Sequence, residues 1–237
     1  MTRTVAVIQA RLGSRRFPEK MLALLGGRSL LEWVVTRVRQ SSLVDHIIVA
    51  TTAEPRDDRL VAECQRLGVV AARGSTDDVL GRIVGALTGD SCDTVVRVCA
   101  DNPFIDGRCI DEAITIHHNE EVDYTFNHRP HGSCNYADGF GAEVISRKLL
   151  EQLHSMPLSL SHREHVTLAV VEGVVSASIH GCLAPPELAR PDLRFDVDLP
   201  GDLARLQQLV TSGNLTPESS AIEVLAVADR VNAIKPS

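Results

Sequence analysis

Short β-branched runs alternate with helical segments along the first half of the chain, and this alternation limits the fold more than any other feature. The expected strands are Val5–Ile8, His46–Ala50, Val69–Ala72 and Thr94–Cys99. The expected helices are Leu30–Gln40, Asp57–Leu67, Val79–Leu87 and Arg108–Asn119. Alternation of this kind implies right-handed crossovers and parallel strands buried on both faces. We therefore predict an α/β chain with a mostly parallel central sheet.

The loop after the first strand has the chemistry of an anion site. It carries four cations within residues 10–20, namely Arg11, Arg15, Arg16 and Lys20. Gly13 is expected to turn with a positive φ, Ser14 offers a hydroxyl, and successive backbone N–H groups can converge on an anion. The chain contains neither the P-loop motif nor the dinucleotide-binding glycine motif. The pattern therefore predicts a phosphate-binding loop of another kind.

An aspartate follows the fourth strand directly. Asp101 stands at the carboxyl end of Thr94–Cys99, where ligands of open parallel sheets gather. Mg²⁺ is commonly held by one or two carboxylates, with water and phosphate oxygens completing its shell. Asp101 is thus a candidate metal ligand, whereas Asp106 is expected to cap the helix that begins near Arg108.

The composition excludes several classes of protein. With 31 acidic and 24 basic residues the net charge is −7, which disfavours a sequence-independent nucleic-acid binder. No apolar run approaches the length of a secretory core or a membrane span. The six cysteines form no C-x-x-C pair, so we expect buried reduced thiols and no zinc ribbon. We expect a cytoplasmic protein without nucleic-acid or membrane partners.

Residues 10–20, which read ARLGSRRFPEK, resemble the CTP-binding signature A-R-x-G-S-x-R-x-P-x-K of the cytidylyltransferases. This family includes the 3-deoxy-manno-octulosonate and acylneuraminate enzymes and, closest in pattern, the spore-coat polysaccharide protein F group. The resemblance spans nearly the whole chain in four ordered segments. It implies a three-layer Rossmann-like nucleotide-diphospho-sugar transferase fold. Residues 1–237 would form a single domain with a small acceptor lobe inserted at about 128–180, and the protein would be a homodimer.

The resemblance also implies the nucleotide and metal sites. Asp101 matches the aspartate of the family's G-D-x-P-L-I segment, with Ala100 in the place of glycine. Asp198 matches the aspartate of V-D-T-P-E-D-L, which holds the second metal position, and Asp196 could assist it from the same side of a strand at 193–200. Arg11, Lys20 and Asp101 would be catalytic. CTP would be bound by Ala10, Arg11, Leu12, Gly13, Ser14, Arg16, Lys20, Arg73 and Asp101, with Mg²⁺ on Asp101 and Asp198.

Two later segments are implied to contact the acceptor. Residues 137–146 resemble P-x-G-L-D-V-E-V-F-S, where Glu143 fits the pattern while Phe140 and Gly141 depart from it. Residues 161–167 are similar to S-x-R-E-H-V-T, in which Ser161 and Glu164 could also form a capping box. The implied acceptor-binding residues are Asp138, Glu143, Arg163 and His165.

The expected activity is Mg²⁺-dependent transfer of CMP from CTP to a small anionic acceptor, with release of pyrophosphate. A sugar acid is the expected acceptor, which would make the product a precursor of surface polysaccharide. A small phosphonate is the alternative, because Arg129, His131 and Arg163 would suit a compact, doubly charged molecule. A non-catalytic nucleotide-binding protein is a further alternative. Glycosyltransfer is another, since Asp196-Val197-Asp198 spells a D-x-D motif.

Overall fold

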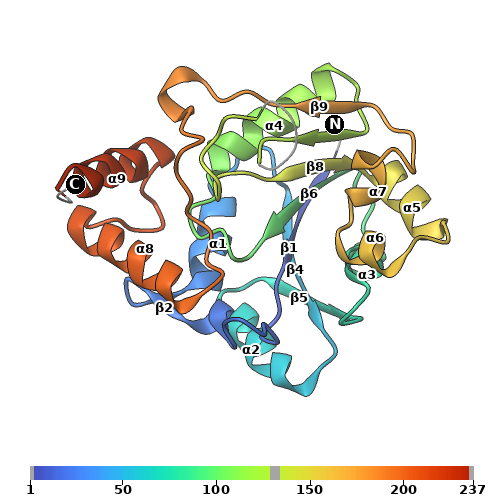
Figure 1. Ribbon diagram of the computed structural model, residues 1–237. Coiled ribbons are helices and arrows are strands. Elements are labelled where there is room, and N and C mark those ends of the chain that lie inside the picture. The colour runs from blue at the N-terminus through green and yellow to red at the C-terminus, as the bar shows by residue number, and fades with distance from the viewer. Residues whose placement is uncertain (1–2, 129–133, 235–237) are drawn as a thin grey trace.

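A seven-stranded sheet forms the centre of the molecule (Figure 1). The structure is a computed structural model that describes residues 3–128 and 134–234. The strand order is β5-β4-β1-β6-β8-β7-β9. The strands are β1 (Thr4–Gln9), β4 (His46–Thr52), β5 (Val70–Gly74), β6 (Thr94–Cys99), β7 (Tyr124–Phe126), β8 (Glu143–Ser146) and β9 (Ile179–Gly181).

The sheet is mostly parallel, as predicted. Strands β5, β4, β1 and β6 run parallel to one another, and β8 alone is antiparallel to both of its neighbours, β6 and β7. Strand β9, which the sequence analysis did not predict, pairs in parallel with β7. The carboxyl ends of β5, β4, β1 and β6 therefore meet at one edge, where the loop at residues 10–20 begins.

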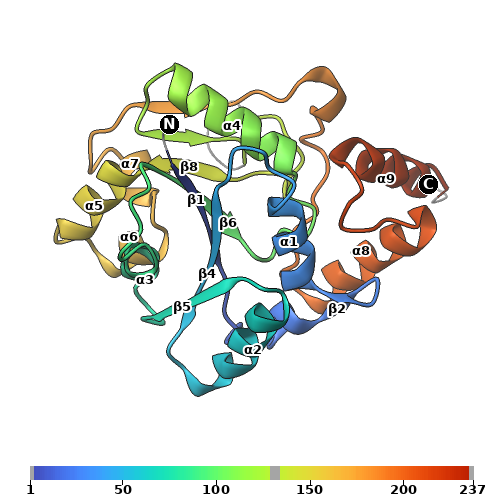
Figure 2. The same ribbon diagram turned by 180° about the vertical axis from the view of Figure 1, so that it is seen from behind.

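Helices cover both faces of the sheet, so the molecule has three layers (Figures 1 and 2). Alternate residues of β1 show why: Ala6 and Ile8 face one hydrophobic cluster, while Val5 and Val7 face the other. All four side chains are fully buried. Burying a side chain such as Val or Ile contributes about 1.5–3 kcal/mol. A strand that is apolar on both faces is therefore stable only between two helical layers.

The first layer consists of five helices that share one hydrophobic cluster. These are α1 (Leu30–Val38), α2 (Asp58–Arg66), α4 (Gly107–Asn119), α8 (Pro200–Gly213) and α9 (Ala221–Ile234). The second layer consists of α3 (Val79–Ala86), α5 (Arg147–Ser155), α6 (Leu160–Glu164) and α7 (Leu168–Val171). The remaining elements are the hairpin β2 (Leu24–Leu25) and β3 (Arg28–Ser29), with the 3₁₀ turns η1 (Lys20–Leu22), η2 (Pro55–Asp57) and η3 (Pro186–Leu188).

The strands and helices predicted in the first half of the chain are confirmed, with small shifts at their ends. The predicted cap of α4 is also confirmed, because the Asp106 carboxylate accepts hydrogen bonds from Arg108 N (2.9 Å) and Cys109 N (3.4 Å). The boundaries of the acceptor lobe stay a prediction. Arg129 and His131 lie outside the described residues.

Two local predictions are wrong. The segment at 193–200 is not a regular strand. Its only strand-like pairing is a single bridge between Arg194 and Asp138, and its other backbone hydrogen bonds are made with residues outside the strands. The helix cap near residue 160 is Ser159, whose hydroxyl accepts a hydrogen bond from His162 N. Ser161 lies inside that helix, so Glu164 cannot act as its partner in a capping box.

Across residues 3–128 and 134–234, no helix is both long and apolar enough to cross a membrane. All six cysteines are free, and Cys99 is the one that is partly exposed.

Candidate active site

The loop at residues 10–20 is held in shape by its own backbone and by strand β4. Ala10 N donates to Ala50 O at 3.2 Å, and Glu19 N closes the loop on Leu12 O at 3.0 Å. The positive φ in this loop belongs to Glu19 (59°) and not to Gly13, so that prediction is wrong. A carbon added at Gly13 would make ordinary contact with Arg56 at 3.5 Å. The space around Gly13 therefore does not require a glycine at this position.

A buried aspartate that the sequence analysis treated only as the start of a helix anchors this loop. Asp57 is fully buried, and its carboxylate accepts hydrogen bonds from Leu12 N (2.8 Å), Thr51 Oγ1 (3.0 Å) and Thr52 N (3.2 Å). Hydrogen bonds to a charged acceptor each contribute about 1.5–3 kcal/mol. Leu12 is a residue that the resemblance assigned to the nucleotide, and its N–H is thus committed to Asp57.

Lys20 joins the loop to both predicted metal ligands. Its ammonium group donates to Asp101 Oδ2 at 3.0 Å, to Asp198 Oδ1 at 3.3 Å and to Val197 O at 2.8 Å. Arg16 contacts the same oxygen of Asp198 at 2.9 Å. The Lys20 side chain is only 10% exposed, so these charges interact in a partly dry site.

Backbone hydrogen bonds explain why Asp101 and Asp198 meet. Val197 N donates to Asp101 O at 2.8 Å, which places the segment before α8 against the end of β6. The Asp202 carboxylate accepts from Asp198 N (3.0 Å) and Leu199 N (2.8 Å), and so fixes the start of α8. Asp196, by contrast, pairs with Arg194. Two carboxylates from distant segments thereby share one cation.

This pair of carboxylates fits a divalent cation. Mg²⁺ prefers hard oxygen donors such as these carboxylates. The Lys20 ammonium, which contacts both Asp101 and Asp198, shows that the space between the two carboxylates accepts a cation. No cluster of three or more His, Cys, Asp or Glu residues able to hold a metal occurs in the part of the chain that the structure describes. Mg²⁺ needs fewer protein ligands than that, because water and phosphate oxygens fill its other positions.

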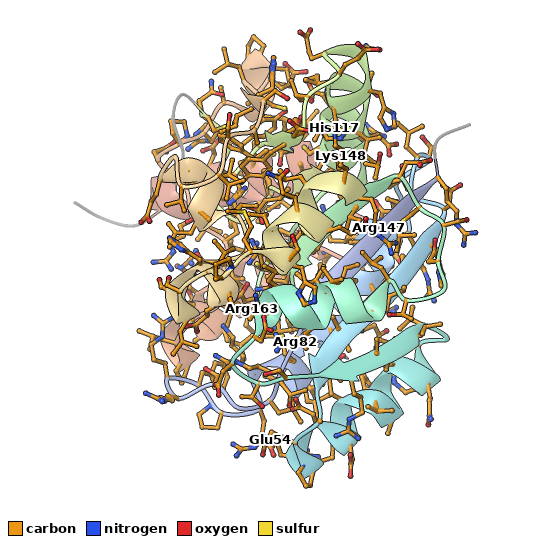
Figure 3. All side chains as sticks on the ribbon, turned by 90° about the vertical axis from the view of Figure 1, so that its right-hand side faces the viewer. Glu54, Arg82, His117, Arg147, Lys148 and Arg163 are labelled. Carbon is orange, nitrogen blue, oxygen red and sulfur yellow. The ribbon has the colours of Figure 1, made fainter. Side chains whose placement is uncertain are left out.

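A cleft of about 890 Å³ opens beside these groups at the carboxyl ends of the parallel strands. It is lined by residues from β1, β4, β6, α3 and the segment after α6. The lining includes seven cations, Arg11, Arg15, Arg16, Lys20, Arg56, Arg82 and Arg97, against five acids, Glu54, Asp77, Asp101, Glu164 and Asp198. Figure 3 labels Glu54 and Arg82 among these. The lining thus carries two more cations than acids, which leaves an excess of positive charge.

Most residues predicted to bind the nucleotide lie in this cleft. Those that line it are Ala10, Arg11, Gly13, Ser14, Arg16, Lys20 and Asp101. Leu12 and Arg73 are not part of the lining. Leu12 is 2% exposed and belongs to the core. Arg73 donates to Thr52 O (3.0 Å) and Glu54 O (2.8 Å), and thus supports two residues that do line the cleft.

Of the predicted acceptor residues, His165 lines the cleft and the other three do not. Arg163 pairs with Asp78 at 2.6 Å, the residue that caps α3. Asp138 bridges to Arg194 and donates its backbone N–H to Leu193 O at 3.0 Å. Glu143 is 3% exposed and lies beneath the cleft floor.

Glu143 is the centre of a buried polar network. Its carboxylate pairs with Arg97 and accepts hydrogen bonds at 2.6 Å from Tyr124 Oη and from Thr167 Oγ1. Burial by itself would raise the pKa of Glu143, but Arg97 and the two hydroxyl donors bring it down to about 2. The same network raises the pKa of Arg97. Both groups stay charged near neutral pH.

Sequence reasoning missed Arg82 and Arg97 as cleft residues. Arg97 had one readable signal, because it is the only charged residue in the otherwise apolar strand β6. A charge in such a strand must be paired or face a site. Arg82 had no comparable signal, since an arginine in a helix is ordinary.

A cationic loop at the end of the first strand contacts two carboxylates at the edge of a cationic cleft, an arrangement suited to nucleotidyl transfer. Residues 5–172 match the family model described as cytidylyltransferase. The chain belongs to this family, and the protein is a CTP-dependent nucleotidyltransferase.

Relatives and solved structures agree with this assignment. The chain is 32% identical over 230 residues to the spore coat polysaccharide biosynthesis protein SpsF of Bacillus subtilis, covering 94% of this chain and 93% of that protein. A cytidylyltransferase from Leptospira borgpetersenii superposes with a TM-score of 0.88 at 25% identity, covering 99% and 97% of the two chains. CMP:2-keto-3-deoxy-manno-octonic acid synthetase, solved with CTP, shares the fold with a TM-score of 0.66 at 18% identity, covering 89% and 99%.

Proposed function

We propose that the protein transfers CMP from CTP to a small anionic sugar acid, in a Mg²⁺-dependent reaction that releases pyrophosphate. The observation that carries this proposal is the position of the Lys20 ammonium between Asp101 and Asp198, at one end of a cleft with excess positive charge. The same parts are needed for nucleotidyl transfer, in which neutralising phosphate charge does most of the work.

In this mechanism the chain positions charges and supplies no covalent nucleophile. Arg11, Arg16 and Lys20 hold the triphosphate. A hydroxyl oxygen of the sugar acid attacks the α-phosphorus and forms a new P–O bond, and the hydroxyl proton passes to water. The bond to the oxygen that bridges to the β-phosphate breaks in line, as pyrophosphate leaves with its electron pair. Mg²⁺ bound to Asp101 and Asp198 would neutralise phosphate oxygens and polarise the α-phosphate. The Arg16 side chain is largely exposed and that of Arg11 is partly exposed, which leaves them able to change partners when the nucleotide enters.

Pyrophosphate release tests this proposal. Each of the four nucleoside triphosphates is incubated with Mg²⁺ and a panel of sugar acids and small phosphonates. We expect release only with CTP and one sugar acid, and none without the acceptor. Release with a phosphonate alone would change the acceptor class, and silence over the whole panel would favour a non-catalytic CTP-binding protein. Release of free sugar from nucleotide sugars would instead indicate glycosyltransfer.

A further inference from the structure

Two arginines that the mechanism above does not use lie together in the cleft. Arg97 comes from β6 and Arg82 from α3, and both line the cleft. Arg97 stands opposite Val7 in the sheet and four residues before Asp101, so it lies deeper than the metal candidates. The two arginines are contributed by different layers of the fold, and nothing in the phosphate-binding loop holds either of them.

Arg97 is fixed in place and still presents a free side of its guanidinium. Its Nε donates to Gln9 Oε1 at 2.9 Å and its Nη1 pairs with Glu143, so neither contact uses Nη2. Its side chain keeps 12% of its surface exposed. Because Arg97 is a cleft residue, a ligand in the cleft can reach this remaining surface. A guanidinium oriented in this way is suited to a planar or tetrahedral oxyanion.

Arg82 has a donor that no described group satisfies. It is 4% exposed, and its Nε is buried without a hydrogen-bond partner among residues 3–128 and 134–234. Its Nη1 instead donates to Ser75 O and Thr76 O. Gly74 makes this position possible, because a carbon added there would meet the Arg82 side chain at 3.0 Å. A buried donor without a partner costs about 1–3 kcal/mol, so its presence points to a ligand.

The charges around Arg82 favour an anion over a neutral ligand. Arg11 Nη1 and Arg82 Nη1 both contact Thr76 O at 3.4 Å, so two guanidinium groups converge on one carbonyl. Burial lowers the pKa of Arg82, Arg11 and Arg97 lower it further, and Asp57 and Asp78 act in the opposite direction. A bound anion would relieve this repulsion between like charges, whereas a neutral nucleobase would not.

The supports of Arg97 place this pair on the acceptor side of the cleft. Glu143 is on β8, and Tyr124 and Thr167, which hold Glu143, come from β7 and from the segment that precedes α7. His165, the predicted acceptor residue that does line the cleft, belongs to the same segment. Of the triphosphate cations, Arg16 and Lys20 contact Asp198, which precedes α8, whereas Arg11 lies beside Arg82 at Thr76 O.

We propose that Arg82 and Arg97 form a second oxyanion subsite, beside Arg11 of the loop at residues 10–20, which binds the carboxylate or phosphonate group of the acceptor. Glu143 and Gln9 act as positioning residues that hold Arg97. The identity of the bound group as part of the acceptor rests on the function proposed above. The existence of a second anion site does not, because it depends only on the geometry of the two arginines.

Calorimetry with two small probes tests the subsite. The protein is first saturated with Mg²⁺ and α,β-methylene-CTP, which fills the triphosphate site without reacting. Methylphosphonate and acetate are then titrated separately. We expect one equivalent of at least one probe to bind, and the stronger probe identifies the acceptor group as phosphonate or carboxylate. Failure of both probes to bind would overturn the proposal.

Conservative variants assign the probe to the two arginines. Arg97→Lys keeps a positive charge beside Glu143, and Arg82→Lys keeps a charge on α3, so both are expected to fold. Each should weaken probe binding at least 10-fold and leave affinity for α,β-methylene-CTP within 2-fold. Arg147→Lys is the matched control, because Arg147 also donates to backbone carbonyls but lies on α5, away from Arg82 (Figure 3). Weaker binding of the CTP analogue in both cleft variants would assign these arginines to the nucleotide and overturn the proposal.

Turnover separates failure of the subsite from failure of the proposed function. If an acceptor is found, its KM should rise at least 10-fold in Arg82→Lys and Arg97→Lys, with the KM for CTP within 2-fold. An unchanged acceptor KM would overturn the subsite and leave cytidylyl transfer intact. Loss of methylphosphonate binding in both variants, together with no turnover on any acceptor, would support the subsite and reject the proposed function.

Discussion

The two ends of the cleft use charge in opposite ways. At the end formed by Lys20, Asp101 and Asp198, an ammonium group bridges two carboxylates that remain 32% and 21% exposed. At the other end, Glu143 and Arg97 form a buried pair in which Tyr124 and Thr167 hold Glu143 and Gln9 holds the Nε of Arg97. Groups of the first kind can exchange one cation for another, whereas the Glu143–Arg97 pair is fixed. We infer that the first end does chemistry and that the second holds Arg97 in position for a ligand.

Asp101→Asn should produce the largest effect, at the end that does chemistry. Removing one charge from the metal pair should lower kcat at least 1000-fold, about 4 kcal/mol in activation free energy. The free energy of unfolding should change little, since Asp101 is partly exposed. Pyrophosphate release and urea unfolding measure the two quantities. Asp192→Asn, whose carboxylate pairs with Arg190 outside the cleft, is the control. Rates like those of the wild type would remove Asp101 from the mechanism.

Glu143→Gln should act mainly on stability. Breaking a buried ion pair leaves Arg97 without its partner and should cost about 3 kcal/mol of unfolding free energy. The effect depends on pH. The pKa of Glu143 is about 2 in the folded protein against an ordinary 4.5, so its contribution is complete above pH 4.5 and is lost as the pH falls toward 2.

Denaturant unfolding between pH 2 and pH 7 checks that the contribution of Glu143 to stability falls with the pH. The difference in unfolding free energy between the wild type and Glu143→Gln should shrink as the pH falls. Glu151→Gln, an exposed partner of Arg147, should show no such trend. Parallel stability curves for the wild type and Glu143→Gln would contradict the assignment of a charged, stabilising Glu143.

Lys20→Ala probes whether the charges at the first end can change partners. CTP affinity should fall about 10- to 100-fold, because a charge-assisted contact to the triphosphate is lost. The variant leaves Asp101 and Asp198 without their shared cation, so Mg²⁺ should raise its melting temperature more than that of the wild type. Calorimetry and thermal unfolding are the measurements, with the exposed Lys148→Ala as control. Unchanged CTP binding would contradict a role for Lys20 in the phosphate site.

The smallest expected effect concerns the segment that carries His165. Ser159→Ala removes the cap of α6 and should lower the unfolding free energy by about 1 kcal/mol. Ser161→Ala, two residues on and inside the helix, should change it by less than about 0.5 kcal/mol. If α6 positions His165, Ser159→Ala should also change the KM for the acceptor more than Ser161→Ala does. An equal loss of stability in both would contradict Ser159 as the cap.

Local pattern was enough to predict the layered fold and the cationic loop after the first strand. The strands β1, β4 and β6 are apolar on both faces, a composition typical of a parallel sheet that helices cover on both sides. The cations of residues 10–20 and the aspartate after β6 lie next to strand ends in the chain itself. The predicted cap at Asp106 was right because capping needs only neighbouring residues.

Contacts between distant segments decided the rest. Leu12 and Asp57 are 45 residues apart, and Lys20 and Asp198 are 178 residues apart, so no local rule could pair them. The same reason explains why residues 193–200 were mistaken for a strand, since their backbone partners, Asp138 and Asp101, lie far away in the chain. The Ser161 error was local, because Ser159 caps the same helix two residues earlier.

Neighbouring residues in the chain are enough to predict the parallel strands β1, β4, β5 and β6, the helices between them and the cationic loop after β1, because each of these arises from adjacent residues. The folded structure brings Glu143 beneath the cleft as a support for Arg97, and it brings Arg82 to the same cleft from α3. The physical reason is that burial and charge pairing depend on which segments meet, and these meetings are set by packing across the whole sheet.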